Sequence, residues 1–140
     1  MTTTIHADET LSRLADRFID FLRTGEAAEG LFAPDLFTDF TMPTWRLQAD
    51  TAESAIALRH AGHQHDPGQI PRWRLDATER GFVLEVEETW HAQGEDWYCR
   101  ELFRADVREG SISELAVYCT GDWDSARVQQ HRAAVRLLRP

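Results

Sequence analysis

The chain has 140 residues, 42% of them hydrophobic and 28% charged, a composition typical of a globular protein with one sizeable core. Its 24 acidic and 15 basic residues leave a net charge of −9, which argues against nucleic acid and anionic membrane surfaces as partners because both would be repelled. No run approaches the roughly 18 apolar residues that span a bilayer. There is no signal-peptide pattern, and the two cysteines lack a CxxC spacing and suit a reducing compartment. We therefore expect one cytoplasmic domain over residues 1–140.

The first predicted element is an amphipathic helix. Its apolar residues recur at helical spacing, at Leu11, Leu14, Ala15, Phe18, Phe21 and Leu22. This helix is expected to run for about 15 residues and to end at Gly25. Another helix is predicted up to Gly62, because Asp50 and Glu53 have the spacing of a capping box. The elements expected between these two helices are, in order, a short helix over 27–32, a strand over 35–43 and a bend at 43–45.

The second half of the chain alternates apolar and polar residues, which predicts a meander of four antiparallel strands. These strands are expected over 72–80, 81–91, 97–107 and 111–120, after a loop at 63–71 and before a terminal helix over 122–138. Asp122 or Asp124 is the expected cap of that helix. The predicted fold class is therefore α+β, with a curved antiparallel sheet and helices packed on one face.

Hairpin turns determine which residues face one another across the sheet. The expected registers make Glu88 and Glu101 diagonal neighbours on the inner face, with α-carbons roughly 7 Å apart. A two-residue turn at 109–110 would place Tyr118 opposite Glu101, whereas a bulge there would exchange Tyr118 for Val117. The other residues expected on the inner face are Trp73, Leu75, Phe82, Leu84, Val86, Trp90, Cys99 and Phe103.

The same turns predict a row of alternating charge on the outer face. Arg74, Glu87 and Arg100 are expected to lie side by side on three strands, an arrangement that cross-strand pairing favours. The turn at 80–81 would also set Trp73 opposite Glu88. Four apolar residues are expected to join the charges on this outer face and to make it a homodimer interface: Val83, Leu102, Leu115 and Val117.

The two inner glutamates invite two interpretations. Each carboxyl group could reach water or pair with an arginine from a helix, Arg46 or Arg59 being candidates. Alternatively, burial and a neighbouring carboxylate raise the pKa of one member, so that Glu88 and Glu101 share a proton and act as acid and base. In that case Glu101 would be the general base, Glu88 its partner, and Tyr118 a donor to a developing oxyanion.

The remaining candidates line or fill the expected pocket. Its predicted walls are Trp45, Trp73, Trp90, Phe40 and Phe103, with His63 as the histidine that faces the ligand. His60, His63 and His65 straddle a helix end and a loop, which is not the convergent arrangement of a metal site. Cys99 and Cys119 are expected to be small fillers. No phosphate loop, serine nucleophile motif or dinucleotide fingerprint is present, so we expect neither a metal nor a cofactor.

The order of elements, the long bent sheet and the turn before the last strand, "REGSISELAVY", resemble the nuclear transport factor 2-like superfamily. Within that superfamily the chain is most similar to SnoaL-like polyketide cyclases and ketosteroid-isomerase-like proteins, over roughly residues 8–137. The stretches "FTMPTWRLQ" and "VYCTGDWD" also look like a set of bacterial proteins of this superfamily. The resemblance implies a cone with a deep hydrophobic cavity, a dimer, and proton transfer without a cofactor. The chain departs from the cyclase pattern in one respect, because no inner histidine accompanies an inner aspartate, and this weighs against aldol cyclisation.

These observations lead to one function and three alternatives. We expect an isomerase, cyclase or dehydratase that acts by acid–base catalysis on a hydrophobic carbonyl compound, with small molecules as its ligands. The first alternative is a binding domain with the same cavity and no chemistry. The second is an epoxide hydrolase-like enzyme, which would need an arginine between the two carboxylates. The third is an interaction module with a filled interior.

Overall fold

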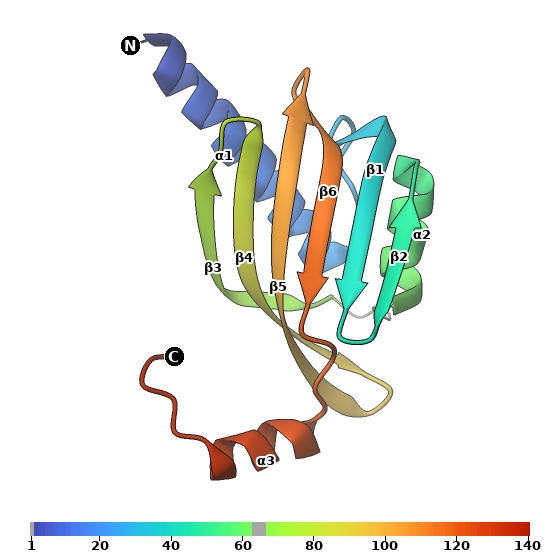
Figure 1. Cartoon of the computed structure of the whole chain (residues 1–140), viewed down its shortest axis with the longest axis vertical. Coiled ribbons are helices and arrows are strands. Elements are labelled where there is room, and N and C mark those ends of the chain that lie inside the picture. Colours follow the sequence, from blue (N-terminus) through green and yellow to red (C-terminus); the bar gives the residue numbers. More distant parts are fainter. Residues whose placement is uncertain (1, 63–66) are drawn as a thin grey trace.

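The computed structural model describes residues 2–62 and 67–140, with side chains from Glu9 onward in those ranges. Its elements are α1 (Thr2–Thr24), β1 (Phe32–Met42), β2 (Trp45–Ala49), α2 (Ala52–Gly62), β3 (Gln69–Ala77), β4 (Gly81–Ala92), β5 (Glu95–Arg108), β6 (Ser111–Cys119) and α3 (Ser125–Ala134). The strands form one curved sheet in the order β2-β1-β6-β5-β4-β3. Figure 1 shows α1 crossing behind the sheet, α2 beside β1 and β2, and α3 beyond the end of the strands. The predicted α+β class is confirmed.

Helix α1 packs its predicted apolar stripe against the sheet. Phe18 is fully buried, and its ring meets that of Phe103 on β5 edge-on, with 4.9 Å between the ring centroids. The helix is longer than expected, but it ends where predicted, because Gly25 has a φ of 77° and donates its N–H to the Phe21 carbonyl oxygen at 2.7 Å. The side chains of α1 thus cover the inner face of the sheet at β3, β4 and β5.

Helix α2 starts one residue later than its predicted capping box. The reciprocal hydrogen bonds join Thr51 and Ser54: the Ser54 N–H donates to Thr51 Oγ1 at 3.0 Å, and the Thr51 N–H donates to Ser54 Oγ at 3.2 Å. The predicted pair Asp50 and Glu53 was therefore wrong as a cap, although the helix itself is confirmed. Two hydroxyl side chains thus form the same reciprocal motif one residue further along.

Between α1 and α2 one sequence prediction was wrong, and another was confirmed but incomplete. The short helix expected over 27–32 is absent, because Gly30 has a φ of 81° and the chain enters β1 at Phe32. The bend expected at 43–45 is the turn of a hairpin, in which β2 follows β1 and Met42 pairs with Trp45. The sheet is therefore mixed rather than wholly antiparallel, since β1 runs parallel to β6.

The hairpin registers agree with the predictions to different degrees. Between β4 and β5 the register is as predicted, with Val86 opposite Glu101 and Glu87 opposite Arg100. Between β3 and β4 the turn covers four residues rather than two, which moves Trp73 from its expected partner Glu88 to Val86. Because the shift is an even number of residues, the inward and outward faces of β3 do not change.

The last strand, β6, differs from prediction because of a β-bulge. Val107 pairs with Ile112 but Asp106 pairs with Glu114, so Ser113 is an extra residue in β6. A shift of one residue exchanges the two faces of the strand beyond that point. Cys119, and neither Tyr118 nor Val117, therefore lies opposite Glu101.

The bulge also corrects the predicted outer face. Leu115 and Val117 are 5% and 1% exposed and belong to the core, whereas Tyr118 is 56% exposed and pairs with Leu102 on the outer face. Two of the four residues expected at a dimer interface are thus inside the molecule. The row of charges is shifted as well, since Arg72 rather than Arg74 lies opposite Glu87.

Helix α3 is attached through its first turn and the segment before it. Asp124 is the N-cap and accepts the Arg127 N–H at 2.8 Å, while the Ser125 hydroxyl and N–H donate to the Glu95 carboxylate on β5. The helix ends at Ala134, short of the predicted residue 138, and buries none of its residues. None of the helices within residues 2–62 and 67–140 combines the length and apolar character needed to cross a membrane.

We predict that Gly81→Ala lowers the free energy of unfolding by about 1–3 kcal/mol, because a Cβ at this position would lie 2.0 Å from the Ala105 carbonyl oxygen on β5. Urea unfolding followed by circular dichroism measures the change. Gly62→Ala is the matched control: nothing lies within 4 Å of its Cβ, so it should change stability by less than about 1 kcal/mol. Equal stability of the two variants would show that β4 and β5 do not approach each other as closely at Gly81 as described.

Candidate functional site

Two carboxylic acids occupy the buried face of the sheet, as predicted. Glu88 on β4 and Glu101 on β5 are 2% and 7% exposed. Glu88 lies opposite Cys99, and Glu101 follows two residues later on the same side of β5, which makes the two glutamates diagonal neighbours. The regular alternation of both strands thus carries the two carboxyl groups into the interior together.

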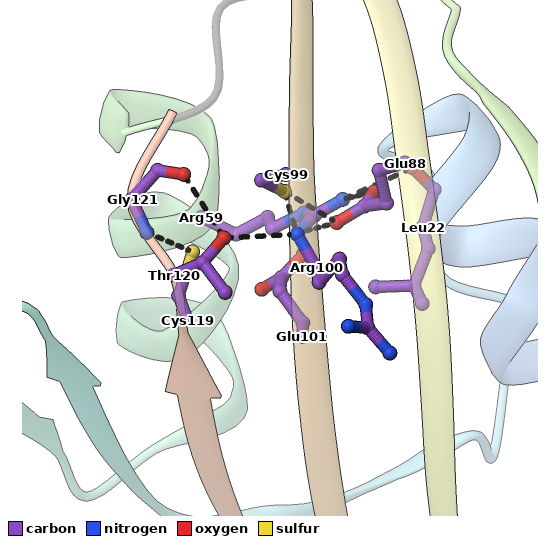
Figure 2. A network of polar contacts seen from close by, with 9 residues as sticks. All are labelled: Leu22, Arg59, Glu88, Cys99, Arg100, Glu101, Cys119, Thr120 and Gly121. Carbon is purple, nitrogen blue, oxygen red and sulfur yellow. Dashed lines mark hydrogen bonds and ion pairs between the residues drawn. The ribbon is translucent and has the colours of Figure 1, made fainter. Parts of the chain in front are cut away.

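A guanidinium group lies between the two carboxylates (Figure 2). Arg59 Nη2 is 2.6 Å from Glu88 Oε1, and Arg59 Nη1 is 3.3 Å from both Glu88 Oε2 and Glu101 Oε1. Its side chain is 9% exposed, so all three charges are largely out of water. Charges buried in this way persist when they are paired and hydrogen-bonded. The interpretation that an arginine joins the glutamates is therefore confirmed, with Arg59 in that place rather than Arg46.

The two helices hold Arg59 in this position. Arg59 lies in the last turn of α2, and its Nη2 also donates to the Leu22 carbonyl oxygen near the end of α1, at 3.1 Å. His60, the next residue, contacts the Gly25 carbonyl oxygen through Nε2 at 2.7 Å. Two hydrogen bonds thus join the end of α2 to the end of α1, and they fix the direction of the guanidinium group.

A pocket of about 370 Å³ opens beside this ion group. Its lining residues come from β1, β2, α2, β5, β6 and the segment after β6: Phe40, Thr41, Met42, Leu47, Leu58, Arg59, Ala61, Gly62, Cys99, Glu101, Val117, Cys119, Gly121 and Asp122. The volume lies in the range of small-molecule sites, and a mostly apolar wall with few polar groups is typical of them. Glu101 and Arg59 face this pocket, whereas Glu88 lies behind them and is not part of its wall.

The predicted wall residues divide into three groups. Phe40 lines the pocket as expected. Trp90 and Phe103 are buried on the inner face but pack in the core, so they do not reach the pocket. Trp45 and Trp73 are 66% and 47% exposed, so their predicted places in the wall were wrong. His63 lies outside the residues that the structure describes.

The positions of Tyr118 and the two tryptophans have identifiable causes. The bulge at Ser113 turns Tyr118 to the outer face, so the predicted oxyanion donor does not lie beside Glu101. Trp45 begins an edge strand instead of folding over the pocket. Trp73 lies on the edge strand β3, at the far side of the sheet from the pocket. None of these causes is visible in the alternation of apolar and polar residues.

Two thiols and a third carboxyl group adjoin the glutamates. Cys99 Sγ is 3.8 Å from Glu88 Oε2 and 3.7 Å from Glu101 Oε1. Cys119 Sγ accepts the Gly121 N–H at 3.4 Å, and Asp122 lies at the rim of the pocket. Sequence reasoning treated Asp122 only as a helix cap, because its approach to the sheet depends on the turn at Gly121.

The surroundings of these three groups shift their pKa values. The hydrogen bond to Cys119, burial and the charge of Glu88 raise the pKa of the Cys99 thiol, and the same hydrogen bond lowers the pKa of Cys119. The thiol pair thus shares one proton-donating contact that favours the thiol form of Cys99 and the thiolate form of Cys119. Asp122 is an exposed residue, but partial desolvation and the charge of Glu88 raise its pKa, against the opposing effect of Arg59.

Two sets of donor atoms in this region are close enough to hold a metal ion. In one set, single oxygens of Glu88 and Glu101 and the sulfur of Cys99 lie within 4.8 Å of one another. In the other, the same limit holds for the sulfurs of Cys99 and Cys119 and an oxygen of Asp122. The first set is already occupied by the guanidinium group of Arg59, and the second is not.

A larger hollow of about 810 Å³ lies between α3 and the outer face of the sheet. Tyr98 lines it and donates its hydroxyl to Glu87 Oε1 at 3.2 Å, while its ring packs against Trp123. Burial and the charge of Glu87 raise the pKa of Tyr98 to about 12. This hollow has no paired buried charges among its lining residues, so we place the candidate site in the smaller pocket on the inner face.

We predict that Arg59→Met lowers the free energy of unfolding by about 3–5 kcal/mol, because it leaves two buried carboxylates without their cation. Denaturant unfolding at neutral pH measures the loss. Arg46→Met is the matched control, since Arg46 forms an equally short ion pair with Asp39 but is 63% exposed, and its loss should leave the free energy of unfolding nearly unchanged. Equal effects of the two substitutions would contradict the buried ion group.

We also predict that Tyr98 ionises near pH 12 in the folded protein. Because the folded state holds this proton more tightly, the stabilisation from the Tyr98–Glu87 contact is complete below about pH 10 and is lost as the pH rises through about 12. Absorbance at the tyrosinate band during a pH titration measures the ionisation. Tyr98→Phe should remove the step near pH 12, and a titration that this substitution leaves unchanged would contradict the burial of Tyr98.

Comparison with known proteins finds similar structures but no similar sequences among families or curated proteins. No protein-family model matches the chain, and no curated protein matches its sequence. Among solved structures, an NTF2-like protein from Anabaena variabilis is 20% identical, with a TM-score of 0.67 over 81% of this chain and 89% of that one. An LEH-like epoxide hydrolase from M. tuberculosis is 11% identical, with a TM-score of 0.62 over 79% and 83% of the two chains.

A third similar structure has a ketosteroid isomerase-like fold and comes from Catenulispora acidiphila, in complex with trimethylamine. It is 12% identical, with a TM-score of 0.55 over 76% of this chain and 85% of that one. At these identities the similarity establishes architecture and not activity. The chain has the NTF2-like fold, as the resemblance in its sequence implied.

Proposed function

We propose that the chain is an enzyme that adds water to a small, mostly apolar electrophile, an epoxide being the class that fits, with Glu101 as the general base. The observation that carries this proposal is the ion group Glu88–Arg59–Glu101 in the wall of a pocket of about 370 Å³. An enzyme that activates water needs a carboxylate that both faces the ligand and is held in a fixed direction. Glu101 meets both requirements.

The three charged residues have different roles in this proposal. Glu101 faces the pocket and touches the water or the ligand, so it is the catalytic residue. Arg59 uses Nη1 and Nη2 on Glu88, Glu101 and the Leu22 carbonyl oxygen, so it positions Glu101. Glu88 lies behind Arg59 and holds the guanidinium group at 2.6 Å. The ion group thus works as one catalytic base with two positioning residues, rather than as an acid beside a base.

The reaction proceeds in one displacement. A water molecule between Glu101 and the ligand gives a proton to the carboxylate, and its oxygen forms a bond to one carbon of the epoxide. The carbon–oxygen bond of the ring breaks, and the ring oxygen keeps the electron pair. That oxygen then takes a proton from solvent at the rim of the pocket, where Gly62 is exposed. The product is a vicinal diol, and Glu101 returns its proton to solvent.

Two observations favour water addition over proton transfer within a carbonyl substrate. Isomerisation, cyclisation and dehydration of a carbonyl compound pass through an enolate, which needs a fixed donor at its oxygen. The residue predicted for that task, Tyr118, lies on the outer face. In the proposed water addition the ring oxygen instead takes its proton from solvent after the strained ring has opened. A carboxylate pair joined by an arginine is the feature that the sequence analysis required of a hydrolase, and a structurally similar protein is an LEH-like epoxide hydrolase. The isomerase-type reaction remains the alternative, with the same base.

We predict that Glu101→Gln lowers the rate of diol formation by about 10²–10⁴-fold while the protein keeps its fold and its affinity for the epoxide. A panel of small apolar epoxides in ¹⁸O-labelled water, followed by mass spectrometry, measures turnover and the source of the added oxygen. Glu85→Gln is the control, since Glu85 lies on β4 but is exposed and pairs with Arg100 on the outer face. It should leave the rate unchanged.

Three results would contradict the proposal. Turnover without incorporation of labelled oxygen would show an isomerase or a related enzyme. Tight binding without turnover, in the original chain as in the Glu101→Gln variant, would show a binding domain. Equal rates for the Glu101→Gln and Glu85→Gln variants would show that Glu101 is not the base.

A further inference from the structure

The wall of the pocket beside Glu101 carries a second group of convergent side chains. Cys99 comes from β5, Cys119 from the end of β6, and Asp122 from the segment that follows. Figure 2 shows the two sulfur atoms on neighbouring strands. The two sulfurs and one Asp122 oxygen lie within 4.8 Å of one another, and all three residues line the pocket. Three donor atoms from separate segments therefore meet in the pocket wall, where Cys99 is buried and Asp122 is exposed.

The spacing of these donors suits a tetrahedral cation. Zinc lies about 2.3 Å from a thiolate sulfur and about 2.0–2.2 Å from a carboxylate oxygen, which sets neighbouring ligand atoms about 3.5–3.8 Å apart. Donors already within 4.8 Å of one another need to move by only about 1 Å to reach that geometry. Because Cys119 and Asp122 lie at the end of β6 and in the following turn, such a movement leaves the sheet intact.

The charge of the surroundings also favours a cation. Five acidic groups meet here: Glu88, Glu101, Cys99, Cys119 and Asp122. Among the described residues that line the pocket, Arg59 is the only basic one. A divalent cation that replaces two thiol protons leaves the total charge unchanged and brings positive charge into direct contact with the three donors.

The kind of donor indicates the kind of cation. Two thiols with one carboxylate suit zinc and similar thiophilic divalent ions, whereas magnesium and calcium prefer oxygen ligands alone. We propose that Cys99, Cys119 and Asp122 form a binding site for a thiophilic divalent cation, with zinc as the representative ion and a fourth coordination position open to the pocket. The site goes beyond the proposed function, because cation binding does not require Glu101 to act as a base.

Cobalt(II) titration of the complete, untagged and fully reduced chain tests the proposal. We expect one cobalt ion per chain, an intense near-ultraviolet thiolate-to-cobalt band, and loss of that band when zinc is added. The two cysteines of the chain are Cys99 and Cys119, so the band can come only from this pair. Cys119→Ser should weaken the band strongly, and Asp122→Asn should keep the band but lower the cobalt affinity by more than about tenfold.

The controls separate this proposal from a folding defect and from the proposed function. Glu85→Gln, on the outer face, should bind cobalt like the original chain, and circular dichroism should show that each variant is folded. No thiolate band, with both thiols shown to be free by titration, would overturn the proposal. The same band in the Cys119→Ser variant, or unchanged affinity in the Asp122→Asn variant, would do so as well. None of these readouts depends on turnover, so failure of the cation site and failure of the enzyme proposal are distinguishable.

Discussion

The arrangement of the inner face depends on one electrostatic constraint, which is that two carboxylates cannot leave water together unless a cation goes with them. Glu88 and Glu101 are carried inward by strand alternation, and Arg59 meets both from the opposite side. The desolvation of three charges is expensive in free energy, and the close contacts at 2.6–3.3 Å offset it. Helix α2 must therefore end where it does, against the end of α1, for the sheet to close around these side chains.

This constraint also separates the two glutamates, which look equivalent in the sequence. Glu88 accepts hydrogen bonds from both Nη1 and Nη2 of Arg59 and lies behind the pocket wall. Glu101 accepts a hydrogen bond from Nη1 alone and faces the pocket. A carboxylate that is held on one side and accessible on the other is suited to act on a ligand. A carboxylate that is enclosed on all sides is suited to hold its partner.

A second part of the pocket wall, beside the ion group of Glu88, Arg59 and Glu101, carries three further ionisable groups. The hydrogen bond to Cys119 and burial raise the pKa of Cys99, and desolvation raises the pKa of Asp122 against the opposing charge of Arg59. The pocket thus has one wall with the ion group Glu88–Arg59–Glu101 and one wall with the ionisable groups of Cys99, Cys119 and Asp122. The proposed base and the proposed cation site therefore lie in different parts of the wall of the same pocket.

The sequence by itself determined the fold class, the first helix to its end at Gly25, the four long strands, and the approach of Glu88 to Glu101. These follow from local periodicity and from the register of the β4–β5 hairpin, which a short glycine-containing turn determines. Only the tertiary structure decided the face of Tyr118, the places of Trp45 and Trp73, the choice of Arg59 over Arg46, and the convergence of Asp122 with the two cysteines. The physical reason is that one extra residue, Ser113, exchanges the faces of a strand, and that contacts between distant segments depend on how helices and sheet pack, which no local pattern records.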